Sequence, residues 1–268
     1  MLFLAIFLRS VARQRVLVYL HTPYLETYLE NPVWQLIIGA LARQSTYVIV
    51  LTSYARAVLA KHGLSGKARV IPNPFRACAR RAERIENVSG EVTVLTMGRL
   101  VKGKGILETV MAMSRLPGNY RLVVAGDGEL AALMREVISE NRLESRVVMK
   151  GWVSGVEKDE LLANANVFCL PSTVDSFGMS FVEAQCYDLP IVAFRHPPVL
   201  EVICPERAIF VSELAIDSLA EAIKKAAEIG SEGVLEGGAK WVNDLFGISK
   251  IANLLGGIIE EALNKRCP

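Results

Sequence analysis

The chain has 268 residues, of which 51% are hydrophobic, and its 30 Lys and Arg side chains nearly balance 28 Asp and Glu side chains. A chain of this length can bury a sizeable core in one large or two small domains. The formal net charge of +2 excludes the strongly basic composition of many nucleic-acid-binding proteins, so we expect no nucleic-acid partner.

The N-terminal residues 1–8 form an apolar run, which Arg9, Arg13 and Arg15 follow. The run is far shorter than the roughly 20 residues that a membrane-spanning helix needs, and it lacks the basic start and clear cleavage site of a signal peptide. Two interpretations stay open. The run forms a buried helix, or it forms a helix that lies on a membrane surface with its arginines toward anionic headgroups.

Short β-branched runs alternate with stretches of helical periodicity along the chain. We predict strands over Val16–Leu20, Tyr47–Leu51, Ala68–Ile71, Val92–Met97, Tyr120–Ala125, Arg146–Lys150, Val167–Leu170, Ile191–Phe194 and Ala208–Val211. We predict helices over Gly105–Arg115, Glu129–Asn141, Lys158–Ala165 and Ser218–Gly230, and within Glu236–Asn264. This alternation of apolar strands with helices predicts an α/β fold of parallel, Rossmann-like sheets with helices on both faces. Ligands of such folds bind at the carboxyl ends of the strands.

A domain boundary is indicated after Pro72-Asn73-Pro74, because residues 74–90 contain no strand signal. We therefore predict a partial, three-stranded Rossmann-like domain over residues 1–80 and a six-stranded nucleotide-binding domain with C-terminal helices over residues 81–268. The linker carries an arginine cluster, which we interpret as a solvated face, with a phosphate or lipid site as the alternative. The cluster consists of Arg76, Arg80, Arg81 and Arg84.

The five cysteines include no Cys-x-x-Cys pair, which favours reduced thiols in a cytoplasmic protein without a metal site. They are Cys78, Cys169, Cys186, Cys204 and Cys267.

The first candidate binding segment, Gly98-Arg99-Leu100-Val101-Lys102-Gly103-Lys104-Gly105, directly follows a predicted strand. Its glycines allow close backbone approach to a phosphate, and Arg99 and Lys104 can neutralise a diphosphate. The segment matches neither the Walker phosphate-binding loop nor the Gly-x-Gly-x-x-Gly dinucleotide fingerprint. A solvated basic loop is the alternative.

Two further candidates also follow predicted strands. Gly126 and Gly128 flank Asp127 in a turn that suits close approach to a ligand, and the backbone of Gly151-Trp152-Val153 could bind the edge of a nucleobase. For both segments, an ordinary strand-end turn stays open as the alternative.

The most informative segment is residues 171–190. Asp175 lies in a polar turn after a strand, and Glu183 follows eight positions later in a helix that begins near Ser180. A turn before a helix N-terminus favours anions, because unpaired backbone N–H groups and the helix dipole point toward the ligand. Two carboxylates would repel a bare anion, so we expect a ligand that also carries hydroxyl groups. Alternatively, Glu183 only complements the helix dipole.

These segments, in this order, resemble the retaining GT-B glycosyltransferases of family 4. The resemblance covers roughly residues 16–230 and is strongest over 92–203. It implies that Arg99 and Lys104 hold the diphosphate of a nucleotide sugar and that Glu183 holds the ribose hydroxyls. It further implies that Asp175 and the amides of Phe177, Gly178 and Met179 contact the transferred sugar and the diphosphate. Gly98, Gly126, Trp152, Val153 and Ser180 complete the predicted substrate-binding set.

His21 ends the first predicted strand, in Tyr19-Leu20-His21-Thr22-Pro23. The resemblance implies that it faces the reacting sugar, whereas a lone strand-end histidine is often structural. Three residues depart from the family pattern. Asp175 replaces a glutamate, Asp188 stands at a usual glycine position, and Pro74 replaces the glycine expected after Pro72-Asn73.

The resemblance predicts hexose transfer from a UDP- or GDP-sugar to a glycan or lipid-linked acceptor at the cytoplasmic membrane face, without metal or cofactor. The first domain is shorter than is usual in the family, so we also expect self-association or a complementing N-terminal chain. The alternatives are a truncated relative that needs a partner chain, a GT-B epimerase or phosphorylase, and a non-catalytic nucleotide-sugar-binding subunit.

Overall fold

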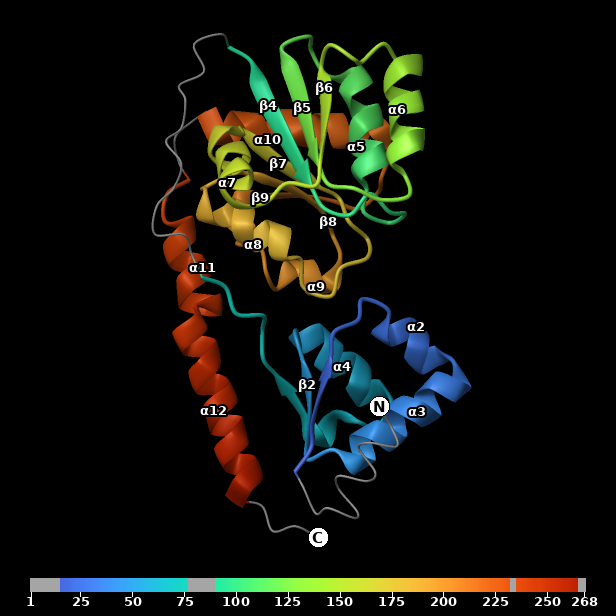
Figure 1. Cartoon of the computed structure of the whole chain (residues 1–268), viewed down its shortest axis with the longest axis vertical. Helices are drawn as coiled ribbons and strands as arrows, with labels where there is room; N and C mark the ends of the chain where they lie inside the picture. The colour runs from blue at the N-terminus through green and yellow to red at the C-terminus, as the bar shows by residue number, and fades with distance from the viewer. Residues whose placement is uncertain (1–14, 77–89, 232–234, 265–268) are drawn as a thin grey trace. The chain divides into compact units, whose positions relative to one another are not determined.

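The computed structural model describes residues 15–76, 90–231 and 235–264. The described chain forms two compact units, and Figure 1 labels most of their helices and strands. The first unit contains residues 15–76, 175–177 and 244–264, and the second contains the remaining described residues. Several features singled out above lie outside this part of the chain: residues 1–8, Arg9, Arg13, Cys78, Arg80, Arg81, Arg84 and Cys267.

All nine predicted strands are present, and their ends fall within one residue of the prediction. They are β1 Leu17–Leu20, β2 Tyr47–Val50, β3 Ala68–Val70, β4 Val92–Met97, β5 Tyr120–Ala125, β6 Val147–Gly151, β7 Val167–Leu170, β8 Ile191–Phe194 and β9 Ala208–Val211.

The predicted helices are also confirmed. The helices are α2 Leu25–Glu30, α3 Pro32–Gln44, α4 Ser53–Lys61, α5 Ile106–Ala112, α6 Ala131–Glu140, α7 Gly155–Asn164, α8 Met179–Cys186, α9 Pro197–Leu200, α10 Ile216–Ser231, α11 Gly238–Phe246 and α12 Ile248–Asn264. Short 3-10 turns are η2 Ser65–Lys67, η3 Met113–Arg115 and η4 Pro205–Arg207. None of the helices in the described ranges combines the length and the apolar composition that a bilayer crossing requires.

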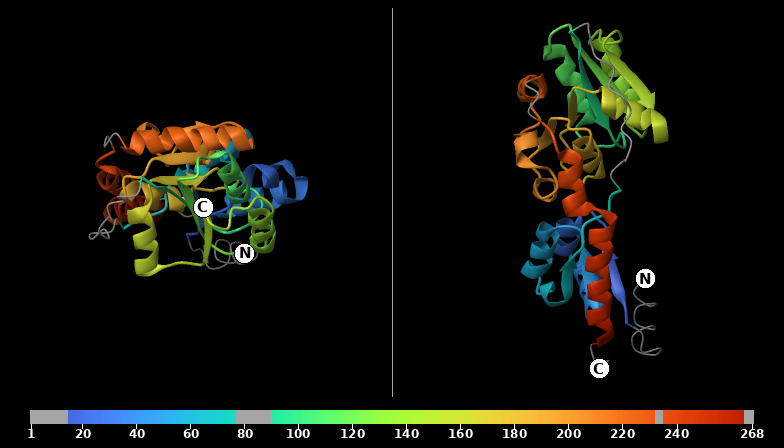
Figure 2. Two further views of the ribbon diagram at one scale, coloured as in Figure 1. Left: turned by 90° about the horizontal axis from the view of Figure 1, so that it is seen from above. Right: turned by 90° about the vertical axis from the view of Figure 1, so that its left-hand side faces the viewer.

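The first unit is built on a parallel sheet with strand order β1-β2-β3. Every residue of β2 is buried, as expected for a central parallel strand covered on both faces. On one face, Val48 and Val50 pack in a core with apolar residues of α2, α3 and α4. On the other face, Ile49 packs with Ile71 and with Ile251 of α12. Figures 1 and 2 show α12 lying along this sheet.

Helix α12 belongs to a different unit from the one predicted. We expected the C-terminal helices to belong to the second domain, but residues 244–264 group with the first unit. The physical reason is apolar burial, because Ile251 covers a face of β2 that would otherwise be open to water. Residues 77–89 lie outside the description, so the boundary near residue 80 stays a prediction.

The second unit is built on a six-stranded parallel sheet with strand order β6-β5-β4-β7-β8-β9. Helix α10 packs against α5 and against β7, β8 and β9, while α7 contacts β4 and α8 contacts β8. The order reverses at β4, whose neighbours are β5 on one side and β7 on the other. In open α/β sheets, ligands bind beyond the carboxyl ends of the strands at such a reversal. The fold therefore directs attention to the loops after β4 and β7.

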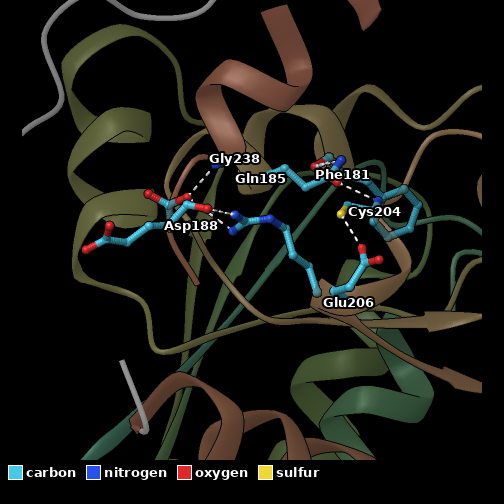
Figure 3. Close-up of polar contacts among 8 residues, drawn as sticks. Phe181, Gln185, Asp188, Cys204, Glu206 and Gly238 are labelled. Carbon is cyan, nitrogen blue, oxygen red and sulfur yellow. Dashed lines mark hydrogen bonds and ion pairs between the residues drawn. The ribbon is translucent and has the colours of Figure 1, made fainter. Parts of the chain in front are cut away.

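A buried polar network fixes the end of α8 (Figure 3). The Asp188 carboxylate accepts hydrogen bonds from Arg207 Nη1 at 3.1 Å and from the Gly238 amide at 2.7 Å. The Arg207 side chain is only 6% exposed. Asp188 has φ +56°, which explains why a glycine is usual there, and aspartate tolerates this conformation better than most residues. Its carboxylate thus supplies bonds that glycine could not.

Asp188→Asn should lower the free energy of unfolding by about 2 kcal/mol, because Arg207 would stay buried without its counter-charge. Asparagine keeps the tolerance for positive φ, so the change isolates the charge. Asp217→Asn is the matched control, since Asp217 pairs with Arg115 on the surface, with side chains 82% and 59% exposed. This control should cost less than about 1 kcal/mol. Chemical denaturation measures both values, and equal losses would contradict a special role for the buried pair.

Candidate functional site

The loops after β4, β5 and β6 are joined by backbone hydrogen bonds at the carboxyl edge of the second sheet. The Gly98 amide donates to the Ala125 carbonyl at 3.0 Å, and the Gly126 amide donates to the Gly151 carbonyl at 2.7 Å. A side chain on Gly126, at φ +154°, would place its Cβ 1.8 Å from the Gly98 carbonyl oxygen. Glycine at position 126 is therefore required by backbone packing, whether or not it also contacts a ligand.

The loop after β4 also packs directly on the loop after β7. The Thr173 amide donates to the Gly103 carbonyl at 2.8 Å. A Cβ on Gly105, at φ +70°, would lie 2.4 Å from the Pro171 carbonyl oxygen. These glycines were predicted to allow a phosphate close to the backbone, and the structure shows that they allow the neighbouring loop to approach. The result is a continuous edge on both sides of the strand-order reversal.

The predicted cations lie in the first of these loops. Arg99 is exposed, whereas Lys104 is half-buried between Gly103 and Gly105. Lys102, which the sequence analysis did not single out, is also exposed in the same loop. Three cationic side chains therefore come from a single loop at the carboxyl end of β4, and such side chains can bind phosphate groups.

Helix α8 begins at the end of the β7 loop. Gly178 precedes it in the left-handed conformation, with φ +90°, and no side chain caps the helix. Met179 and Ser180, its first two residues, are half-buried. The Phe181 amide donates to the Gly178 carbonyl at 3.1 Å. The N–H groups before it have no partner within the helix, so this end can bind an anion.

Glu183 lies in the next turn of α8 and forms an ion pair. Its Oε1 is 2.8 Å from Nζ of Lys158 on α7, with the two side chains 20% and 29% exposed. No sequence pattern points to Lys158 as the partner of Glu183, because it precedes Glu183 by 25 residues and belongs to another helix. No spacing within either segment signals this contact.

The two predicted residues of the loop after β6 differ in their exposure to solvent. Trp152 is 73% exposed, whereas Val153 is 8% exposed and belongs to the core. The Val153 side chain is therefore unavailable to a ligand, and only the backbone of this residue could serve the predicted contact.

Three predicted residues belong to the first unit. His21 is exposed after β1, with its ring centroid 5.6 Å from that of Tyr19. Asp175 is half-buried, and Phe177 is buried edge-on against Phe246 at a centroid distance of 5.3 Å. The chain joins Asp175 and Phe177 to the second unit at Gly178. The other ten predicted site residues all lie at or next to the carboxyl edge of the second sheet.

Two of the three described thiols, Cys169 and Cys204, have raised pKa values and are poor nucleophiles. Burial raises the pKa of Cys169 to about 12, in β7 beneath the site. The pKa of Cys204 is raised by burial and by its hydrogen bond to Glu206. Both thiols are therefore neutral near pH 7. Within the described ranges, no three His, Cys, Asp or Glu side chains gather as a metal site would need.

Comparison with known proteins gives the family. A family model for glycosyl transferases group 1 matches residues 80–232, which is more than half of the chain. A phosphatidylinositol N-acetylglucosaminyltransferase subunit from Arabidopsis thaliana is 30% identical over 182 residues, which are 66% of this chain and 40% of that protein. The chain thus spans less than half the length of this relative.

Solved structures show the same fold. Sucrose-phosphate synthase from Thermosynechococcus elongatus has a TM-score of 0.82 at 22% identity, covering 98% of this chain and 71% of that one. Anabaena HepE, in complex with UDP and glucose, has a TM-score of 0.81 at 18% identity, covering 97% and 75%. These likenesses confirm the predicted α/β fold of GT-B type. With the family model matching over residues 80–232, the chain belongs to the glycosyl transferases group 1 family.

Proposed function

We propose that this chain is a retaining glycosyltransferase that moves a hexose from a UDP- or GDP-sugar to a glycan or lipid-linked acceptor. One observation carries the proposal. A cationic loop, an uncapped helix N-terminus and a half-buried carboxylate all lie at the carboxyl edge of one sheet, where its strand order reverses. A nucleotide sugar offers matching groups, namely a diphosphate for the cations and the helix and hydroxyls for the carboxylate.

The chemical step depends on the leaving group. As the bond between the sugar and the phosphate breaks, negative charge develops on the nucleoside diphosphate. Arg99, Lys104 and the first-turn amides of α8 would stabilise that charge where it appears. The leaving phosphate would then accept the proton of the acceptor hydroxyl. This arrangement already neutralises the diphosphate, so the proposal needs no metal.

The carboxylates set the selectivity of the site. A carboxylate accepts hydrogen bonds and repels phosphate, so Glu183 favours the hydroxyl-bearing part of the ligand over its diphosphate. We assign Glu183 to the ribose and Asp175 to the transferred sugar. The predicted role of His21 toward the reacting sugar is part of the same proposal.

The names of the similar proteins support the donor and acceptor classes. The Arabidopsis relative is named for transfer of N-acetylglucosamine to phosphatidylinositol, which favours a lipid-linked acceptor. HepE was solved with UDP and glucose, which favours a UDP-sugar donor. We place the reaction at the cytoplasmic face of a membrane, where such an acceptor would be reached.

A second function is favoured by the name of the Arabidopsis relative, which describes that protein as one subunit of a transferase. In this alternative the chain uses its second unit to bind a nucleotide sugar and catalyses no transfer itself. A partner chain would carry out the transfer. It predicts nucleotide binding without turnover.

Binding is tested by thermal unfolding with UDP, GDP and ADP. The nucleotide that binds, at 100 times its dissociation constant, should add about 2.7 kcal/mol of stability. Glu183→Ala should remove this response, because the ribose would lose its acceptor. Glu160→Ala is the matched control, since Glu160 is an exposed carboxylate on α7. An unchanged response in Glu183→Ala would remove the ribose assignment, and no response in the unmodified chain would remove the proposed function.

Turnover separates the two functions. The unmodified chain should release UDP or GDP from UDP-glucose, UDP-N-acetylglucosamine or GDP-mannose. Arg99→Met and Lys104→Met should each lower the rate about 100-fold, because each removes a charge that stabilises the leaving group. Arg135→Met, at an exposed position of α6, should leave the rate unchanged. Tight nucleotide binding with no release from any of these donors would favour the non-catalytic alternative.

A further inference from the structure

The ion pair between Lys158 and Glu183 has no role in the function proposed so far. It joins α7 to α8 at 2.8 Å, with both side chains less than one third exposed. Lys158 is the only cation in α7, where its neighbours Glu157, Asp159 and Glu160 are all acidic. None of these acids stands three or four positions from Lys158, the spacing at which side chains meet on a helix. Lys158 is therefore available to an acid on another helix.

The position of Glu183 creates an electrostatic problem that this pair solves. A carboxylate next to a diphosphate site repels the phosphates, and the repulsion is stronger where water is partly excluded. Partial burial of Glu183 makes an uncompensated charge there unfavourable as well. An ammonium group at 2.8 Å offsets the charge of the carboxylate, which can still accept further hydrogen bonds.

The pair also restricts the geometry of the carboxylate. Glutamate has several rotatable bonds, and an unpaired side chain must be ordered when a ligand binds. Lys158 contacts Oε1, so the remaining acceptor positions of the carboxylate have a defined direction before the ligand arrives. A carboxylate oriented in advance gains more from a ribose hydroxyl than a mobile one does.

We propose that Lys158 is a positioning residue for nucleotide recognition, which holds the Glu183 carboxylate in a fixed orientation so that the site selects ribose over deoxyribose. This inference rests on the proposed function, because it needs a nucleotide at this site. It assigns Lys158 no contact with the substrate and no part in bond breaking.

The experiment compares UDP, GDP and ADP with their 2′-deoxy counterparts by isothermal titration calorimetry. For the nucleotide that binds, the unmodified chain should prefer the ribose form about tenfold or more, the value of one hydrogen bond to a charged group. Lys158→Met should reduce this preference to about twofold. A change that only weakened the fold would lower the unfolding temperature and leave the preference unchanged.

Three variants serve as controls. Lys150→Met removes the same charge from a nearby, more exposed pair, in which Lys150 and Glu157 are 3.9 Å apart, and should keep the full preference. Lys158→Arg retains the positive charge and should keep the preference within about threefold of the original. In a Glu183→Ala background, Lys158→Met should have no further effect, because the group that it orients is gone.

Each outcome decides one claim. If the unmodified chain binds no nucleotide, the proposed function fails and this inference fails with it. If it binds nucleotide without preferring ribose, the assignment of Glu183 is wrong, and so is the inference. If it prefers ribose and Lys158→Met prefers ribose equally, the proposed function stands and the inference alone is wrong. Should Lys158→Met not fold, Lys158→Gln gives the same comparison with a more soluble side chain.

Discussion

The candidate site depends on direct backbone contact among the loops that follow β4, β5 and β7. Two of these contacts leave no room for a side chain, because a Cβ on Gly105 or Gly126 would meet a carbonyl oxygen of the neighbouring loop. Once the loops touch, their amides bond across strand ends, from Gly98 to Ala125 and from Thr173 to Gly103. The loops are thereby held together without help from a ligand. A preorganised edge of this kind loses little conformational entropy when it binds.

The charges at this edge are divided between the two sides of the strand-order reversal. The β4 loop supplies Arg99, Lys102 and Lys104, whereas Glu183 follows the helix N-terminus on the β7 side. Lys158 offsets the charge of Glu183, so the ion pair as a whole adds little net charge near the α8 N-terminus. Without this offset, the carboxylate would oppose the cations and the helix dipole. The same edge can then attract phosphate and still present an acceptor to hydroxyls.

The sequence predicts the strands well, and it also predicts which polar turns share one edge of the second sheet, for a physical reason. Strands buried on both faces are short β-branched apolar runs, and in a parallel sheet the polar residues after them gather at one edge. Gly98, Gly126 and Gly178 are therefore found from local pattern alone. Contacts between helices leave no such pattern, which is why the Lys158–Glu183 and Asp188–Arg207 pairs were missed. The sequence of α12 also indicates that this helix has an apolar face. It does not indicate that the face packs on Ile49 and Ile71.

Helix α8 links the stability of the second unit to its binding edge. Eight residues are too few for a helix to be stable by its own propensity, so tertiary contacts must hold it. Its end is held by buried groups, since Gln185 is fully buried and accepts a hydrogen bond from the Cys204 amide at 2.8 Å (Figure 3). The Gln185 side chain also donates to the Val202 carbonyl at 3.1 Å. Asp188 adds the bond to Arg207 just beyond the helix. Because these contacts concentrate at the C-terminal end, the first turn and Glu183 are positioned by groups that no ligand would touch. Residues outside the candidate site thus help to determine where the first amides of α8 and the Glu183 carboxylate lie.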